Sequence, residues 1–119
     1  MTVSLHELQT KALETAQRFI DYDSYQSSAA TAVRALHRRC EGWTKEQCKE
    51  WFDKSVVAHK HGIAFIQAHS EDAWEAHNQD RNAIDFTPFA GDYMAAHPAF
   101  PEDLLLDVLV WAFHWYHLR

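Results

Sequence analysis

The sequence predicts an all-α protein: a single compact helical bundle of five to six helices with a buried C-terminal helix. Apolar residues recur every three or four positions along most of the chain, as they do in amphipathic helices. Several of these stretches are preceded by Ser or Thr, which favour helix N-caps. Three glycines and three prolines in 119 residues supply too few turns for a many-stranded sandwich or barrel. The length fits one domain over residues 1–119.

The first two helices are predicted in the first third of the chain. Ser4 and Glu7 fit a capping box, and the apolar spacing that follows predicts a helix over residues 5–21. The polar segment 21–28 predicts a loop or frayed turn. A second apolar repeat then begins at Tyr25 and reaches Cys40, and Gly42 fits the residue that ends a helix.

A long third helix is predicted from Thr44 onwards. Thr44 and Gln47 form a second capping box, and an apolar stripe continues from Cys48 to Ile66. Gly62 leaves two interpretations open for residues 44–69. It lies at the edge of the apolar face, where it would let a neighbouring helix approach closely, or it ends one helix before a shorter one begins.

Three shorter segments complete the prediction. Ser70 fits the N-cap of a helix that reaches about Asn78, followed by a connection at 78–88. Thr87 and Pro88 fit the start of a short helix over 89–97. Pro101 then opens the last helix in the same way.

That last helix is apolar nearly all round, with a polar stripe formed by Asp103, Asp107, His114 and His117. Such a helix is usually covered by neighbours, with its polar stripe reaching water or a shared polar seam. Fourteen residues rise about 21 Å, so one metal ion cannot bind both ends of the stripe. His114 and His117 are spaced to bind one ion together if further donors come from another helix.

A histidine site is therefore one functional hypothesis. His59 lies in the middle of the apolar face of the third helix, and His59, His114 and His117 would share an interhelical cavity. The protein would then bind a metal or be a metal-dependent enzyme. The alternative is that these histidines are hydrogen-bonded core or surface residues. A pocket lined by some of the five tryptophans, which would bind an apolar small molecule, is a third hypothesis.

Charge favours a different function. The chain as a whole has a formal charge of −6. Residues 70–119 contain nine carboxylates and only two basic side chains, Arg81 and Arg119, so this part carries the whole excess of negative charge. This excess argues against nucleic-acid binding and favours a basic protein partner. The leading hypothesis is a small interaction protein of the immunity or inhibitor type. Its predicted contact residues form an exposed acidic patch with apolar side chains between the carboxylates: Asp80, Asp85, Phe86, Phe89, Asp92 and Tyr93.

The remaining features set limits on these hypotheses. The first residues have neither a basic segment nor an apolar segment typical of signal peptides, so we expect a cytoplasmic location. Cys40 and Cys48 match no common zinc spacing and are expected to be reduced and packed. No stretch long and apolar enough for a membrane span is found, and no motif predicts a catalytic activity or a cofactor. Whether the chain is an enzyme or a homo-oligomer stays open.

Overall fold

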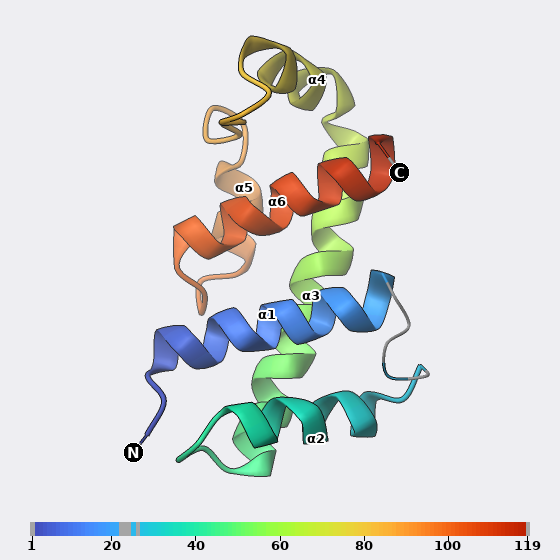
Figure 1. Cartoon of the computed structure of the whole chain (residues 1–119). Coiled ribbons are helices and arrows are strands. Elements are labelled where there is room, and N and C mark those ends of the chain that lie inside the picture. Colours follow the sequence, from blue (N-terminus) through green and yellow to red (C-terminus); the bar gives the residue numbers. More distant parts are fainter. Residues whose placement is uncertain (1, 22–24, 26, 119) are drawn as a thin grey trace. The chain divides into compact units, whose positions relative to one another are not determined.

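The computed structural model describes residues 2–21, 25 and 27–118, and the regular secondary structure in this part is entirely α-helical (Figure 1). Six helices follow one another, so the predicted all-α class is confirmed. Their bounds are α1 (Leu5–Asp21), α2 (Ala29–Arg39), α3 (Lys45–Ala68), α4 (Ser70–Gln79), α5 (Gly91–Ala96) and α6 (Glu102–His117). None of these helices, within the described residues, combines the length and the hydropathy needed to traverse a bilayer.

The chain divides into two compact units. The N-terminal unit is Met1–Val57 and the C-terminal unit is Ala58–Arg119. Helix α3 contributes its first part to the N-terminal unit and the rest to the C-terminal unit.

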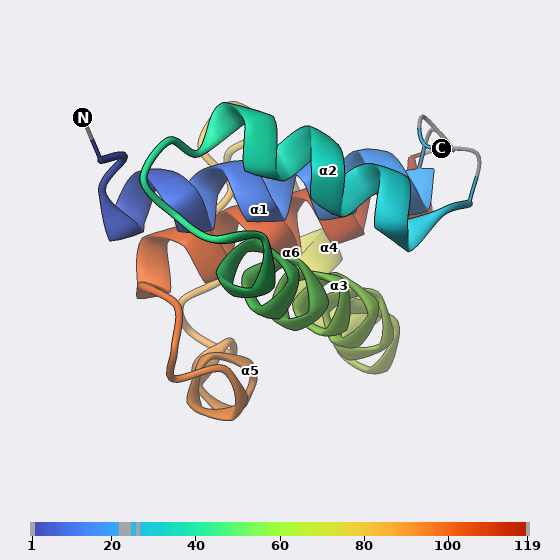
Figure 2. The same ribbon diagram turned by 90° about the horizontal axis from the view of Figure 1, so that it is seen from below.

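In the N-terminal unit, α1 and α2 lie side by side and run in opposite directions, while α3 crosses them and is seen end-on in Figure 2. The bounds predicted for α1 are confirmed, and the Ser4 hydroxyl accepts a hydrogen bond from the Glu7 amide at 3.1 Å. The core of this unit is formed by small and medium apolar residues of the three helices: Leu8, Ala12, Ala16, Ala32, Val33, Leu36, Cys40, Cys48 and Phe52.

Helix α2 begins four residues later than the apolar repeat indicates. Ser28 is its N-cap and accepts a hydrogen bond from the Thr31 amide at 3.2 Å. Ser27 has a φ of 58°, which interrupts a helix, so Tyr25 lies in a turn before it. Of the predicted loop, residues 22–24 and 26 lie outside the described part.

The turn between α2 and α3 depends on a glycine. Gly42 has a φ of +92°, and a Cβ atom there would lie 2.6 Å from the Thr2 hydroxyl oxygen. Only glycine adopts this conformation readily and leaves room for the N-terminal segment. Trp43 fixes the same segment, because its indole N–H donates to the Val3 carbonyl at 2.6 Å.

Residues 45–68 form one helix, which decides between the two interpretations of Gly62. The capping box is present: Thr44 N–H donates to Gln47 Oε1 at 2.9 Å, and Gln47 N–H donates to the Thr44 hydroxyl at 3.1 Å. A Cβ atom at Gly62 would lie 3.3 Å from Val108 and 3.7 Å from Ala112, both on α6. The glycine therefore permits a close approach of α6 to α3, as predicted.

The starts of α4 and α5 differ from the predicted ones. His69 is the N-cap of α4, and Ser70 is its first helical residue, with its hydroxyl 3.0 Å from His117 Nε2. Helix α5 begins at Gly91 and not at Phe89. The reason is local: Thr87 hydrogen-bonds Asp85 and Phe89 N–H donates to the Phe86 carbonyl, so this segment forms turns.

Helix α6 has the predicted buried face, but Pro101 is its N-cap and not its first helical residue, which is Glu102. Its buried residues are Leu104, Leu105, Val108, Leu109, Ala112 and Phe113. Asp103, Asp107 and His114 of the polar stripe are exposed, so much of the stripe reaches water. Phe86, Tyr93 and Phe100 add buried rings to the core of this unit.

Candidate functional site

Two hollows flank helix α4 in the C-terminal unit. One is a cleft of about 200 Å³ between α4 and the segment that leads to α5, lined by Asp72, Glu75, Ala76, Gln79, Asp85, Pro88 and Phe89. The other is an open hollow of about 650 Å³, lined by Ser70, Glu71, Trp74, Glu75, Asn78 and Gln79. Glu75 and Gln79 line both hollows, so the two hollows are neighbours on the exposed side of α4 and are treated together as one region.

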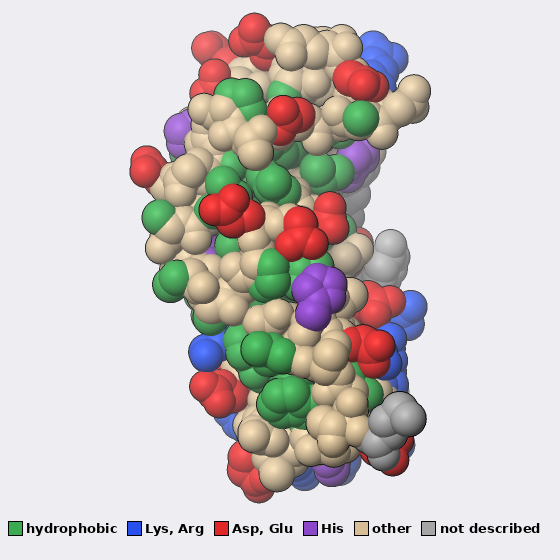
Figure 3. All heavy atoms as spheres, turned by 90° about the vertical axis from the view of Figure 1, so that its left-hand side faces the viewer, with side chains coloured by type: hydrophobic (Ala, Val, Ile, Leu, Met, Phe, Trp, Pro, Cys, Tyr) green, Lys and Arg blue, Asp and Glu red, His purple; other side chains and the backbone are tan. Residues whose placement is uncertain are grey.

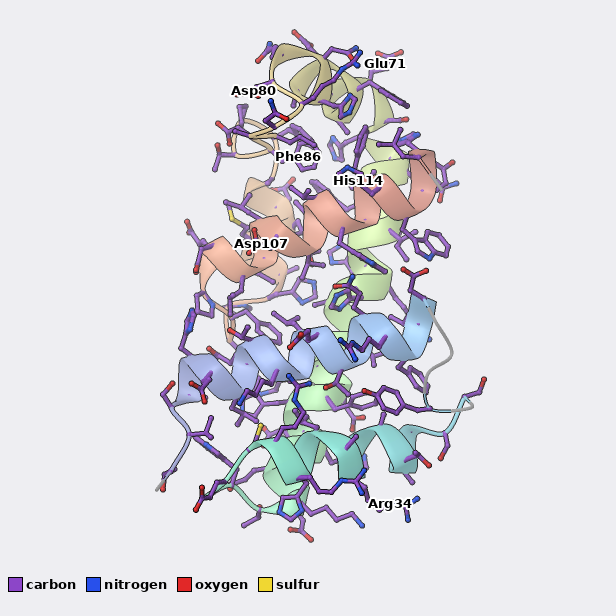
Figure 4. All side chains as sticks on the ribbon, viewed as in Figure 1. Arg34, Glu71, Asp80, Phe86, Asp107 and His114 are labelled. Atoms are coloured by element: carbon purple, nitrogen blue, oxygen red, sulfur yellow. The ribbon has the colours of Figure 1, made fainter. Side chains whose placement is uncertain are left out.

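This region combines carboxylates with aromatic rings, and we call it the α4 surface. It comprises the exposed residues Glu71, Asp72, Glu75 and Asp85 and the partly exposed rings of Trp74 and Phe89. Figure 4 shows Glu71 on α4 and Asp80 at the start of the segment that follows it. Two predicted contact residues, Asp85 and Phe89, are thus brought together with α4 side chains that the sequence prediction left out.

Two other predicted contact residues are buried, where we expected exposed rings. Phe86 is 1% exposed and packs against Phe113 with ring centroids 5.9 Å apart. Tyr93 is fully buried, and its hydroxyl donates to the Ala58 carbonyl at 2.7 Å. Phe86 and Tyr93 thus anchor the 80–97 segment to the core, whereas Phe89 remains at the surface.

The aspartates of the same segment are exposed but have different neighbours. Asp80 Oδ1 accepts hydrogen bonds from the Asn82 and Ala83 amides, at 3.0 and 3.1 Å, and so forms a local turn. Asp85 accepts from the hydroxyl and amide of Thr87, which lowers the pKa of its carboxyl group. Asp92 lies in the first turn of α5. All three side chains are exposed and contribute to the negative formal charge of this unit.

Negative charge is concentrated in the C-terminal unit. All nine carboxylates between residues 71 and 107 are exposed, and Figure 3 shows acidic side chains over this unit with hydrophobic side chains between them. In the N-terminal unit, four exposed carboxylates pair with Lys or Arg: Lys11–Glu7, Arg39–Glu14, Lys49–Asp53 and Lys54–Glu50. The two units therefore present different electrostatic surfaces.

The three histidines predicted as metal ligands have separate environments. His59 is buried, with its ring edge-on to Trp111 at 4.7 Å. His114 is exposed, and its Nδ1 lies 2.9 Å from the Val110 carbonyl of its own helix (Figure 4). His117 contacts Ser70 and packs against Trp74. Among the described residues, no three His, Cys, Asp or Glu side chains are grouped closely enough to bind a metal ion.

A different pair of histidines lies in direct contact. His61 Nδ1 on α3 and His97 Nε2 at the end of α5 are 2.7 Å apart. Both rings pack against Tyr93, with centroid distances of 5.1 and 4.9 Å. The sequence contains a signal for this contact that the prediction missed. His61, Phe65 and His69 are spaced four residues apart, and so are Phe89, Tyr93 and His97, which gives two aromatic rows that meet.

The cysteines are free, buried and close to each other, as predicted for packed thiols. Burial, with a smaller contribution from the neighbouring Cys40, raises the pKa of Cys48 to about 11. Burial also raises the pKa of Cys40. Neither thiol has the lowered pKa expected of a nucleophile.

Comparisons of this chain with protein-family models, with curated proteins and with solved structures find no match.

Proposed function

We propose that the protein is a small interaction protein whose α4 surface binds a basic segment of a partner protein, as an immunity or inhibitor protein does. The observation that carries this proposal is the arrangement around α4, where four exposed carboxylates and two partly exposed aromatic rings border two neighbouring hollows. Aromatic side chains supply most of the binding energy at many protein interfaces, and charged rims supply orientation and speed of association.

The chemistry of the partner follows from this arrangement. Lysine and arginine side chains on the partner would meet Glu71, Glu75 and Asp85, and an apolar side chain would enter the cleft beside Phe89. Association would be fast and would weaken with added salt, because exposed charges are screened beyond about 8–10 Å at physiological ionic strength.

The test is a photo-crosslinking experiment in the cells that produce the protein. A photoreactive amino acid replaces Gln79, which is uncharged and lines both hollows. The same amino acid at Gln67, an exposed residue of α3 outside both hollows, is the matched control. We expect a basic protein to be captured from position 79 and not from position 67, with mass spectrometry identifying both the partner and the contact.

Charge reversal then tests whether the carboxylates cause the binding. With the captured partner purified, the double variant Glu71→Lys and Glu75→Lys should bind it at least about tenfold more weakly, because charged groups facing a complementary surface become repulsive. The variant Glu102→Lys and Asp107→Lys changes the net charge equally at exposed positions of α6. Equal loss of binding in both variants, or capture of an acidic partner, would contradict the proposal.

A further inference from the structure

The hydrogen bond between His61 and His97 depends on how many protons the two rings hold. The two facing nitrogens are 2.7 Å apart, which is a hydrogen-bond distance with room for one hydrogen atom between them. In the neutral pair, one ring donates its N–H and the other accepts with its lone pair. A first additional proton can bind at an outer nitrogen and leave this bond intact. A second additional proton places N–H groups on both facing nitrogens, and the hydrogen bond is lost.

The surroundings supply no compensating negative charge in the contact itself. Tyr93 packs on both rings, but burial raises the pKa of its hydroxyl, which therefore stays neutral. The α6 atoms beside neighbouring Gly62 belong to Val108 and Ala112. Among the described residues, no carboxylate or thiol forms a group of three with the two histidines. The surrounding elements are α3 from residue 58 onwards, α5 and α6. Their other titratable or charged side chains are exposed, except for buried His59 and half-buried His69 and His117; the exposed ones are Lys60, Asp92, Glu102, Asp103, Asp107, His114 and Tyr116.

The two rings join elements of unequal stability. His61 lies inside the 24-residue helix α3, whereas His97 caps the six-residue helix α5. A helix as short as α5 is not stable alone, so it depends on contacts with the rest of the unit. Two of these contacts are the Tyr93 hydrogen bond to the Ala58 carbonyl and the His61–His97 pair. Loss of the pair would free the C-terminal end of α5 and the turn that follows it.

We propose that the His61–His97 pair is an acid-sensitive contact, and that double protonation releases the end of α5 and the turn at residues 97–100 from α3. The direction of the response follows from the proton count. The released form accepts both additional protons freely, whereas the closed form accepts only the first, so acid favours the released form. Burial and the neighbouring His61 both lower the pKa of His97, in agreement with a closed form that resists the second proton.

Amide hydrogen exchange of the whole chain at pH 7.5 and pH 5.0 tests this proposal, with exchange rates corrected for the intrinsic effect of pH. Two informative amides are His97 N–H, bonded to the Met94 carbonyl, and Phe100 N–H, bonded to the His97 carbonyl. We expect their protection to fall at least about tenfold between pH 7.5 and pH 5.0, since a pKa difference of one unit corresponds to a factor of ten. Protection of the α2 amides should fall less.

Two neutral replacements separate this mechanism from a general effect of acid. In His97→Gln, the side-chain amide replaces Nε2 and can still hydrogen-bond His61, but it cannot be protonated in this range. The extra loss of protection at pH 5.0 should disappear, whereas His37→Gln, at an exposed position of α2, should keep it. His61→Asn replaces Nδ1 and serves as the second test if the first variant does not fold. An unchanged pH response in the variants, or no response in the natural protein, would overturn the proposal.

Discussion

Replacing Tyr93 with Phe removes one hydroxyl group from the core of the C-terminal unit. This hydroxyl is fully buried and donates to the Ala58 carbonyl at 2.7 Å. In a regular helix that carbonyl also accepts the amide of Gly62, four residues later. Because Gly62 has no side chain, the Tyr93 hydroxyl can lie close to its backbone, 3.5 Å from the position that a Cβ atom would occupy. The tyrosine thus adds a second hydrogen bond to a carbonyl that keeps its helical partner in the variant.

Tyr93→Phe should therefore cost the free energy of one hydrogen bond, because the Ala58 carbonyl keeps another hydrogen-bond donor. This amounts to about 0.5–1.5 kcal/mol of the free energy of unfolding, because the ring itself is preserved. Urea unfolding followed by near-ultraviolet circular dichroism measures it, and Tm should fall by roughly 3–6 °C. Tyr93→Ala, which also removes the ring, should cost about 3–5 kcal/mol.

The matched control is Tyr116→Phe, which removes the same hydroxyl from a side chain that is 41% exposed. It should change the free energy of unfolding by less than about 0.5 kcal/mol. Equal effects of the two Phe variants would refute the reasoning. So would a loss above about 3 kcal/mol for Tyr93→Phe, because the Ala58 carbonyl would then depend on the tyrosine alone.

Three further predictions concern a helix cap, the thiols and a histidine. Ser28→Ala should destabilise the N-terminal unit by about 1 kcal/mol and reduce hydrogen-exchange protection at the start of α2, whereas Ser28→Gly should cost less. Cys48, whose pKa burial raises to about 11, should react with a thiol reagent at pH 8 only when the unit opens, so its labelling rate should rise with urea as the unit unfolds. Burial lowers the pKa of His117, so its ring resonances should titrate below pH 6.5, and its contribution to stability should be complete above that pH and decline as the pH falls; a midpoint above 6.5 would contradict this.

The helices were predictable where one local signal dominates. The bounds of α1 follow from a cap and a long apolar repeat, and the continuity of α3 follows from a stripe that passes through Gly62. Errors arose where two signals compete. Tyr25 continues the repeat of α2, but the Ser28 cap and the positive φ of Ser27 determine where the helix begins. Thr87 matches a cap by type, yet its hydroxyl hydrogen-bonds Asp85.

The candidate surface was predicted only in part, because composition does not reveal which side of a short segment is buried. The excess of carboxylates after residue 70 identified the acidic unit, and Asp85 and Phe89 belong to the α4 surface. Periodicity does not assign Phe86 to the core, since Phe86 lies in a connection without a regular repeat, and the six residues of α5 are too few to define a buried face that includes Tyr93. The His61–His97 contact joins residues 36 positions apart. The four-residue spacing marks each aromatic row separately, but which two rows meet depends on tertiary packing.

The two units should respond differently to mild acid, because their histidines occupy different environments. His6 and His37, the histidines of the N-terminal unit, are exposed. In the C-terminal unit, several histidine rings pack against aromatic side chains: His59 against Trp111, His61 against Tyr93, and His77 and His117 against Phe113. Burial lowers the pKa of His97 and of His117, because a charged imidazole is disfavoured where water is removed, so lowering the pH should open the C-terminal unit first.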